Sequence, residues 1–257
     1  VANGAGTLFS GARRLSKDGA AVHHHMGVSA FAEYAVCSRN SLIKVDQSLG
    51  FEEAALFGCA VLTGVGAVVN TAKAPPGTTA AVLGLGGVGL NAMLGALMSG
   101  CREVIAVDLQ DEKLDLARQL GATQTFNAGD PDCAEQVREV TKGGVDYAFE
   151  MAGSVKALGL AYQITRRGGT TVTAGLPHPE HTLDIPAVTL VAEERTLKGS
   201  YIGGCVPLRD MPRYIELYQK GRLPVDRLMS ETIPLDQINA AFDRLADGHT
   251  VRQILVP

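Results

Sequence analysis

Two hydrophobic periods alternate along most of this chain, one typical of strands and one typical of helices. From residue 79 onward, short apolar runs are followed by stretches with apolar residues at helical spacing. Repeated βαβ units of this length predict an α/β fold with a doubly wound parallel sheet over residues 61–200, covered by helices on both faces. The expected strands are 80–83, 103–107, 123–126, 145–150 and 170–174, and the expected helices are 88–99, 112–120, 133–141 and 155–165.

The two flanking segments have weaker patterns. An apolar run over 54–69 predicts a buried helix, which would begin after Ser48 as the N-cap and end before Pro75. Each flank is too short to form a domain by itself, so residues 1–60 and 201–257 are expected to combine into one partly β lobe. Within them we expect an irregular segment over 1–27, strands at 31–36, 42–45, 231–233 and 251–256, and helices at 208–219 and 235–245.

Composition and charge narrow the classes of function. The 257 residues include 23 basic and 27 acidic side chains, for a net charge of -4, so we expect no nucleic-acid partner. The longest apolar run is shorter than the ~20 residues that a bilayer span requires, so we expect no membrane partner. The chain opens with no export signal, and its five cysteines form no CxxC pair, which together favour a reducing, cytoplasmic location.

The glycine-rich turn after the first strand of the alternating region is the strongest chemical signal. In the run Gly84-Leu-Gly86-Gly87-Val88-Gly89, Gly84 would permit a tight turn, Gly86 the approach of a pyrophosphate, and Gly89 close packing of helix and sheet. The next strand ends in Asp108, at the spacing of an acid that binds adenosine ribose hydroxyls. The alternative is a packing turn with an unrelated aspartate.

Asp108 also bears on the choice of cofactor. A carboxylate there would repel a 2′-phosphate, and no arginine follows it closely, so NAD is favoured over NADP. Lys113 lies one helical turn further on, where it would bond a ribose hydroxyl or simply be solvated.

A second candidate pair lies in the apolar helix. Cys59 and Thr63 are four residues apart, so we expect them to share one helix face. Spacing alone leaves open whether Cys59 is a metal ligand or a buried core residue, and the buried residue is the more common case.

Several motifs together resemble the zinc-dependent alcohol dehydrogenases of the medium-chain dehydrogenase/reductase superfamily, over essentially the whole chain. The resemblance implies a Rossmann domain with the C-terminal part of a GroES-like catalytic lobe, and hydride transfer between a zinc-bound alcohol or aldehyde and NAD. The motifs are His23-His24-His25-Met26-Gly27, Phe31-Ala32-Glu33-Tyr34, Gly58-Cys59, the Gly84–Gly89 turn, Gly143-Gly144-Val145-Asp146, and Arg252.

The resemblance also implies roles for single residues. Cys59 matches a catalytic zinc ligand, Asp108 the ribose-binding acid and Arg252 a basic residue that reaches the pyrophosphate. Thr63 and Val88 match residues that lie against the nicotinamide. The positions whose backbone holds the carboxamide in the family are matched by Ala174, Leu176 and Ile202.

The departure from the family concerns zinc. In the family, about a third of the subunit precedes the point where this sequence starts, and it carries the other zinc ligands and the proton relay. A catalytic zinc needs three protein ligands, so we expect the chain as given to bind NAD without oxidising alcohols. Such an incomplete chain would be a fragment, a processed form or a truncated gene product. Two other possibilities stay open, a catalytically silent NAD-binding module and a zinc-free quinone or enoyl reductase, although Cys59 argues against the reductase.

The remaining motifs have plainer interpretations. The histidine triplet at 23–25 is expected to be structural, and nothing assigns a role to His178 and His181. Residues 182–200 are expected to join two copies of the chain into a homo-oligomer, either a dimer or a tetramer, through an exposed edge strand. The other four cysteines are interpreted as buried small hydrophobes or bystanders: Cys37, Cys101, Cys133 and Cys205.

Overall fold

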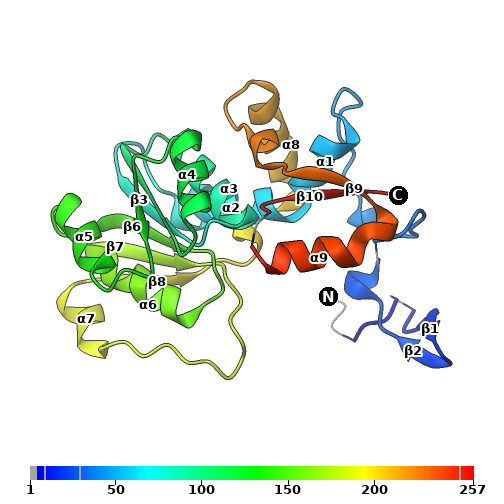
Figure 1. The fold of residues 1–257 in the computed structure, drawn as a ribbon, viewed down its shortest axis with the longest axis horizontal. Coiled ribbons are helices and arrows are strands. Elements are labelled where there is room, and N and C mark those ends of the chain that lie inside the picture. Colours follow the sequence, from blue (N-terminus) through cyan, green and yellow to red (C-terminus); the bar gives the residue numbers. More distant parts are fainter. Residues whose placement is uncertain (1–4, 9, 29, 249) are drawn as a thin grey trace. The chain divides into compact units, whose positions relative to one another are not determined.

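The computed structural model describes residues 5–8, 10–28, 30–248 and 250–257 (Figure 1). The chain forms two compact units, which are described separately: unit 1 is Val1–Asp46 with Ser230–Pro257, and unit 2 is Gln47–Met229. The boundaries expected from the sequence, after residues 60 and 200, both fall inside unit 2. They do so because the long apolar helix and helix α8 (Pro207–Gln219) pack with the rest of that unit.

A six-stranded parallel sheet forms the centre of unit 2 (Figure 1). Its strand order is β5-β4-β3-β6-β7-β8, so the direction of winding reverses between β3 and β6. This order confirms the predicted doubly wound fold, in which ligands bind outside the carboxyl ends of the strands at the reversal. The strands are β3 (Thr79–Leu83), β4 (Glu103–Asp108), β5 (Gln124–Asn127), β6 (Val145–Glu150), β7 (Thr165–Thr173) and β8 (Thr196–Gly199).

Helices connect the strands and cover the sheet. Because alternate residues of a strand point to opposite faces, Leu83 and Ile105 pack with Val137 and Ile164 from the helices on one face, while their sequence neighbours face the other side. α5 and α6 lie on the first face, and α3 and α4 fill the crossovers between β3, β4 and β5. The bounds are α3 (Gly87–Met98), α4 (Asp111–Leu120), α5 (Cys133–Val140), α6 (Val155–Ile164) and α7 (Ala187–Ala192).

The predicted apolar helix is present and runs from Phe51 to Ala72. By length and composition it is apolar enough to cross a membrane, but 67% of its most apolar stretch is buried within the protein, as expected for a core helix. Its N-cap is Gly50 rather than Ser48. Along it, α1 (Phe51–Leu56) and α2 (Leu62–Gly66) alternate with two π-helical segments, Phe57–Val61 and Ala67–Ala72.

Among its described residues, unit 1 contains two small sheets, one α-helix and three short 3-10 helices, His25–Gly27, Arg39–Ser41 and Leu235–Gln237. β1 (Leu15–Lys17) pairs antiparallel with β2 (Ala20–Val22), a hairpin inside the segment that was expected to be irregular, of which residues 1–4 and 9 lie outside the described residues. β9 (Glu231–Pro234) pairs parallel with β10 (Gln253–Val256), and α9 (Ile238–Ala246) connects them.

The expected strands at 31–36 and 42–45 are wrong. Neither segment pairs with another strand among the residues that the structure describes. Side chains such as Tyr34 and Val36 are 90% and 88% exposed. Alternation alone does not make a strand, because a strand also needs a hydrogen-bonded neighbour.

Candidate cofactor-binding site

The glycine turn follows β3 and leads directly into α3. Gly84 has φ +88° and donates its N–H to Val107 O at 2.9 Å, so the turn is tied to the end of β4. A Cβ on Gly89 would lie 1.7 Å from Gly84 O, so no side chain fits there. A Cβ on Gly86 would meet no atom within 4 Å. The turn is therefore packed tightly at its two ends and open at its middle glycine.

The N-terminus of α3 faces this opening with its own backbone. Gly86 is the N-cap, with Gly87 and Val88 in the first turn, where there is no acidic side chain and no side-chain cap. The first N–H groups of a helix have no acceptor within the helix, and they carry partial positive charge. This arrangement is a ready site for an anionic group such as a pyrophosphate.

Asp108, the last residue of β4, is held against the turn. Its Oδ2 accepts from Leu85 N at 2.6 Å and its Oδ1 accepts from Gln110 N at 3.1 Å. A carboxylate has about four acceptor positions, so these bonds fix its orientation and leave others for a ligand.

A cavity of about 580 Å³ lies beside Asp108. Its walls combine polar groups near the turn with apolar side chains from α6, and it is large enough for a nucleoside. The lining residues include Gly84, Asp108, Leu109, Lys113, Ser154 and Leu160, so the structure brings together three residues that the sequence predicted for the cofactor.

The carboxyl ends of β6 and β7 complete this edge of the sheet. The buried Glu150 accepts from Gly153 N at 2.7 Å through Oε1 and from Thr173 Oγ1 at 2.6 Å through Oε2. Ala174 N donates to Glu150 O at 3.0 Å, and a Cβ on Gly153 would lie 3.3 Å from Leu176 N. Ala174 and Leu176 therefore lie together at the end of β7.

The long apolar helix packs directly on α3. A Cβ on Gly64 would lie 2.3 Å from Val88 O, which leaves no space for a side chain between the two backbones. Thr63, the residue before Gly64, is thus brought to the start of α3, where Val88 lies. This contact brings together two segments whose residues Thr63 and Val88, 25 positions apart, were both predicted to lie against a nicotinamide.

Cys59 and Thr63 differ in exposure. Cys59 is exposed and lies in the first π-helical segment, whereas Thr63 is buried in α2. The expectation that the two share one helix face stays a prediction, since a four-residue spacing is close to one full turn in α- and π-helical geometry alike. The alternative that Cys59 is a buried core residue is wrong.

The described residues do not make a catalytic zinc site. Within the described ranges, no three His, Cys, Asp or Glu residues come together in a group that could hold a metal ion. Cys59 offers one thiol, whereas a catalytic zinc takes three protein ligands and an open position.

His24 and the other four cysteines differ in how far they are buried and in what they contact. The buried His24 accepts from Arg14 N through Nε2 at 3.0 Å, as its structural interpretation requires. Burial raises the pKa of the Cys101 and Cys133 thiols, which are core residues as expected. Cys37 and Cys205 are only partly buried, so neither is a core residue, which was one of the two interpretations expected for them.

Arg252 belongs to unit 1 rather than unit 2. Its carbonyl accepts from Ser230 N at 2.7 Å, just before β10.

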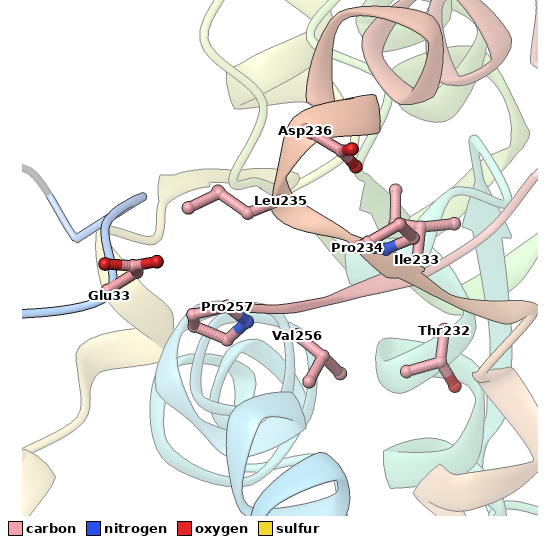
Figure 2. Close-up of a pocket in the computed structure, with 8 residues that line it drawn as sticks. All are labelled: Glu33, Thr232, Ile233, Pro234, Leu235, Asp236, Val256 and Pro257. Atoms are coloured by element: carbon pink, nitrogen blue, oxygen red, sulfur yellow. The ribbon is translucent and has the colours of Figure 1, made fainter.

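Unit 1 also has a cavity of about 510 Å³ between Glu33 and the ends of β9 and β10 (Figure 2). Glu33 and Asp236 are its acidic residues, and none of the predicted site residues lines it.

Reasoning from the sequence missed several residues that shape the site. Glu150 ends a strand as Asp108 does, but no motif marks it. Gly64 and Gly66 did carry a signal, because an isolated glycine within a helical pattern indicates close packing.

Comparison with known proteins gives a consistent family. A family model for zinc-binding dehydrogenases matches residues 87–220, more than half of the chain. Alcohol dehydrogenase 1 of Trifolium repens is 37% identical over 245 residues, which cover 94% of this chain and 64% of that protein. The chain therefore spans just under two thirds of this relative.

Solved structures agree with the sequence matches. Benzyl alcohol dehydrogenase from Acinetobacter calcoaceticus superposes with a TM-score of 0.91 at 32% identity, covering 97% of this chain and 68% of that one. An alcohol dehydrogenase zinc-binding domain protein from Burkholderia ambifaria gives a TM-score of 0.92 at 34% identity, covering 98% and 69%. With the glycine turn and Asp108 in place on a doubly wound sheet, this chain belongs to the zinc-binding dehydrogenase family.

Proposed function

We propose that this protein transfers hydride between a small alcohol or aldehyde and NAD, and that unit 2 binds the cofactor. The observation that carries the proposal is the turn at Gly86, which is open where a pyrophosphate would lie and closed at Gly84 and Gly89. The fixed carboxylate of Asp108 beside it supplies the ribose acceptor. NAD, when bound, accepts or returns the hydride.

The adenosine half of the cofactor would be held mainly by the glycine turn and β4. The pyrophosphate would accept hydrogen bonds from the first N–H groups of α3, at Gly87 and Val88. The ribose hydroxyls would donate to Asp108, and Lys113 lines the same cavity. A 2′-phosphate would meet the Asp108 carboxylate, so we propose NAD rather than NADP.

The nicotinamide half would lie where the long helix meets α3. Thr63 and Val88 would contact the ring, and the backbone at Ala174, Leu176 and Ile202 would hold the carboxamide. Arg252, in unit 1, is proposed for the pyrophosphate on the resemblance alone. Cys59 is the one proposed zinc ligand, since its thiol is exposed, and any further ligands would come from outside the described residues.

We also propose that the protein forms a homo-oligomer, either a dimer or a tetramer, through the edge of the sheet. β8 is the last strand of the sheet, and all four of its residues are exposed. On the neighbouring α7, Val188 and Val191 are 68% and 81% exposed. An exposed edge strand flanked by apolar side chains is a natural pairing surface.

We also propose a cytoplasmic location for the protein. The five cysteines are free thiols, which supports this location.

Gly86→Ala tests the cofactor proposal. The new methyl group meets no protein atom within 4 Å, so the thermal unfolding midpoint should not change. It would occupy the space proposed for the pyrophosphate, so calorimetry should show at least about a tenfold loss of NAD affinity, the cost of about 1.4 kcal/mol.

Gly159→Ala, in α6, is the matched control, because its Cβ also meets no atom within 4 Å and it does not line the cavity. The control should bind NAD normally. Unchanged NAD binding by Gly86→Ala would refute the proposed site.

A further inference from the structure

The segment after β8 has a strained backbone at Ile202. Three consecutive residues, Ile202, Gly203 and Gly204, have φ values of +49°, +64° and +59°. Glycine adopts this left-handed region freely, but a β-branched residue there is an outlier. Such a conformation persists only when the surrounding structure holds it in place, and strained residues cluster at ligand sites.

The long apolar helix closes one side of this loop by direct backbone contact. A Cβ on Gly203 would lie 2.1 Å from Leu62 O, and one on Gly66 would lie 2.5 Å from Gly203 O. No side chain separates the two segments. The helix that carries Thr63 therefore also fixes the position of the backbone next to Ile202.

A partly buried polar cluster fixes the other end of the loop. The Cys205 thiol donates to Leu62 O at 3.2 Å and accepts from Asn70 Nδ2 at 3.2 Å. Asn70 Nδ2 also lies 3.3 Å from Tyr214 OH, and Tyr214 is 4% exposed on α8. Three segments thus meet at one sulfur atom: the second π-helical segment, the loop and α8.

The cluster keeps its protons at neutral pH. Burial raises the pKa of the Cys205 thiol and of the Tyr214 hydroxyl. Cys205 therefore remains a neutral donor to Leu62 O instead of a thiolate, which that carbonyl oxygen would repel.

We propose that Cys205, with Asn70 and Tyr214, is a positioning group that holds the backbone of Ile202 in its left-handed conformation for the nicotinamide end of the cofactor. The proposal rests on the proposed NAD site. None of the three side chains is assigned a contact with the cofactor, so their effect is exerted through Ile202. Losing them should change how the nicotinamide is bound and should leave the adenosine half as it was.

Two ligands distinguish binding at the nicotinamide half of the proposed site from binding at the adenosine half, and both can be titrated into the 257-residue chain. NADH contains the nicotinamide, and ADP-ribose lacks it while keeping the adenosine, the pyrophosphate and both riboses. Titration calorimetry gives both affinities, and the fluorescence of bound NADH reports the surroundings of the reduced ring. The variants are Cys205→Ala, which removes the hydrogen bonds, and Cys205→Ser, which can remake them.

We expect Cys205→Ala to weaken NADH binding about fivefold, the worth of one hydrogen bond, and to leave ADP-ribose binding unchanged. Its bound NADH should emit closer to the spectrum of free NADH. Cys205→Ser should restore both properties. Cys101→Ala is the matched control, a buried thiol removed just before β4, at the opposite end of that strand from Asp108, and it should not alter either ligand.

Several results would overturn the proposal. Wild-type NADH affinity and fluorescence in Cys205→Ala would show that the thiol positions nothing. Equal weakening of NADH and ADP-ribose would show that it only supports the fold. Wild-type chain that binds ADP-ribose as tightly as NADH, with free-like NADH fluorescence, would show that the loop does not hold the ring. Wild-type chain that binds neither ligand would instead refute the proposed cofactor site itself.

Discussion

Replacing Asp108 with asparagine should shift the cofactor preference from NAD toward NADP. The variant keeps the size and planarity of the side chain, and an amide oxygen can still accept from Leu85 N, so the turn should remain in place. It removes the negative charge that would bind ribose hydroxyls. The change therefore tests the charge of Asp108 separately from its shape.

The size of the effect follows from the surroundings of Asp108. A hydrogen bond to a charged group contributes ~1.5–3 kcal/mol, so NAD should bind about tenfold to a hundredfold more weakly. A 2′-phosphate ~4 Å from the carboxylate would meet a repulsion of up to ~4 kcal/mol per unit charge at an effective dielectric constant of ~20. Because Asp108 is only partly buried, water and salt screen this to ~1–2 kcal/mol, so NADP should bind about tenfold more tightly.

Calorimetric titration of both cofactors into wild type and Asp108→Asn would check these values at one fixed ionic strength. Asp115→Asn, on the exposed side of α4, removes the same charge away from the cavity and should leave both affinities unchanged. If Asp108→Asn bound NAD as tightly as wild type and still excluded NADP, the assignment of Asp108 to the ribose would fail.

Three further predictions concern packing, pH and association. Gly89→Ala should destabilise the fold by at least ~1–3 kcal/mol, since its Cβ would lie 1.7 Å from a backbone oxygen; an unfolding midpoint equal to that of wild type would contradict this. Partial burial alone would raise the pKa of Asp146, but hydrogen bonds from Thr79 and Arg166 outweigh it and lower the pKa below the ordinary 3.8. The ionised Asp146 should therefore contribute its full stabilisation above pH 3.8 and lose it as the pH falls through the lower pKa of the folded state. Urea unfolding should therefore show a gap between wild type and Asp146→Asn that is constant near neutral pH and closes only in strong acid; a gap that closed near neutral pH would exclude this carboxylate as the cause. Light scattering at micromolar concentration should find an oligomer that Val191→Lys weakens, and a wild-type monomer would count against the edge-strand interface.

The sheet and the adenosine end of the site could be predicted because their signals are local. The apolar runs of β3, β4 and β6 fall within one or two residues of their predicted positions, and the glycine turn and Asp108 follow from spacing. β7 is longer than expected and begins at Thr165, because an irregular register lets Thr165 pair with Val145 before the regular pairing starts at Thr170.

The nicotinamide end depends on contacts between distant segments, which spacing cannot supply. Asn70 and Cys205 are 135 positions apart, and neither belongs to a recognisable motif. The buried alternative for Cys59 fails for a similar reason, since the exposure of one residue in an apolar helix depends on which distant segments pack against it. In unit 1, the strands expected at 31–36 and 42–45 failed because alternation carries no information about a pairing partner.

The two π-helical segments let the long helix hold extra residues without rotating one end relative to the other. Each residue advances an α-helix by about 100°, and a π-helical turn accommodates an extra residue without ending the helix. Deleting Gly58 would therefore let Phe57–Val61 relax to ordinary α-helical geometry with little rotation of Phe51–Leu56 relative to Gly64 and Gly66. The same deletion in a purely α-helical stretch would rotate the two parts by about 100°. The contacts that Gly64 and Gly66 make are therefore insensitive to a one-residue change of length at the π-helical segment, although they would not be elsewhere in the helix.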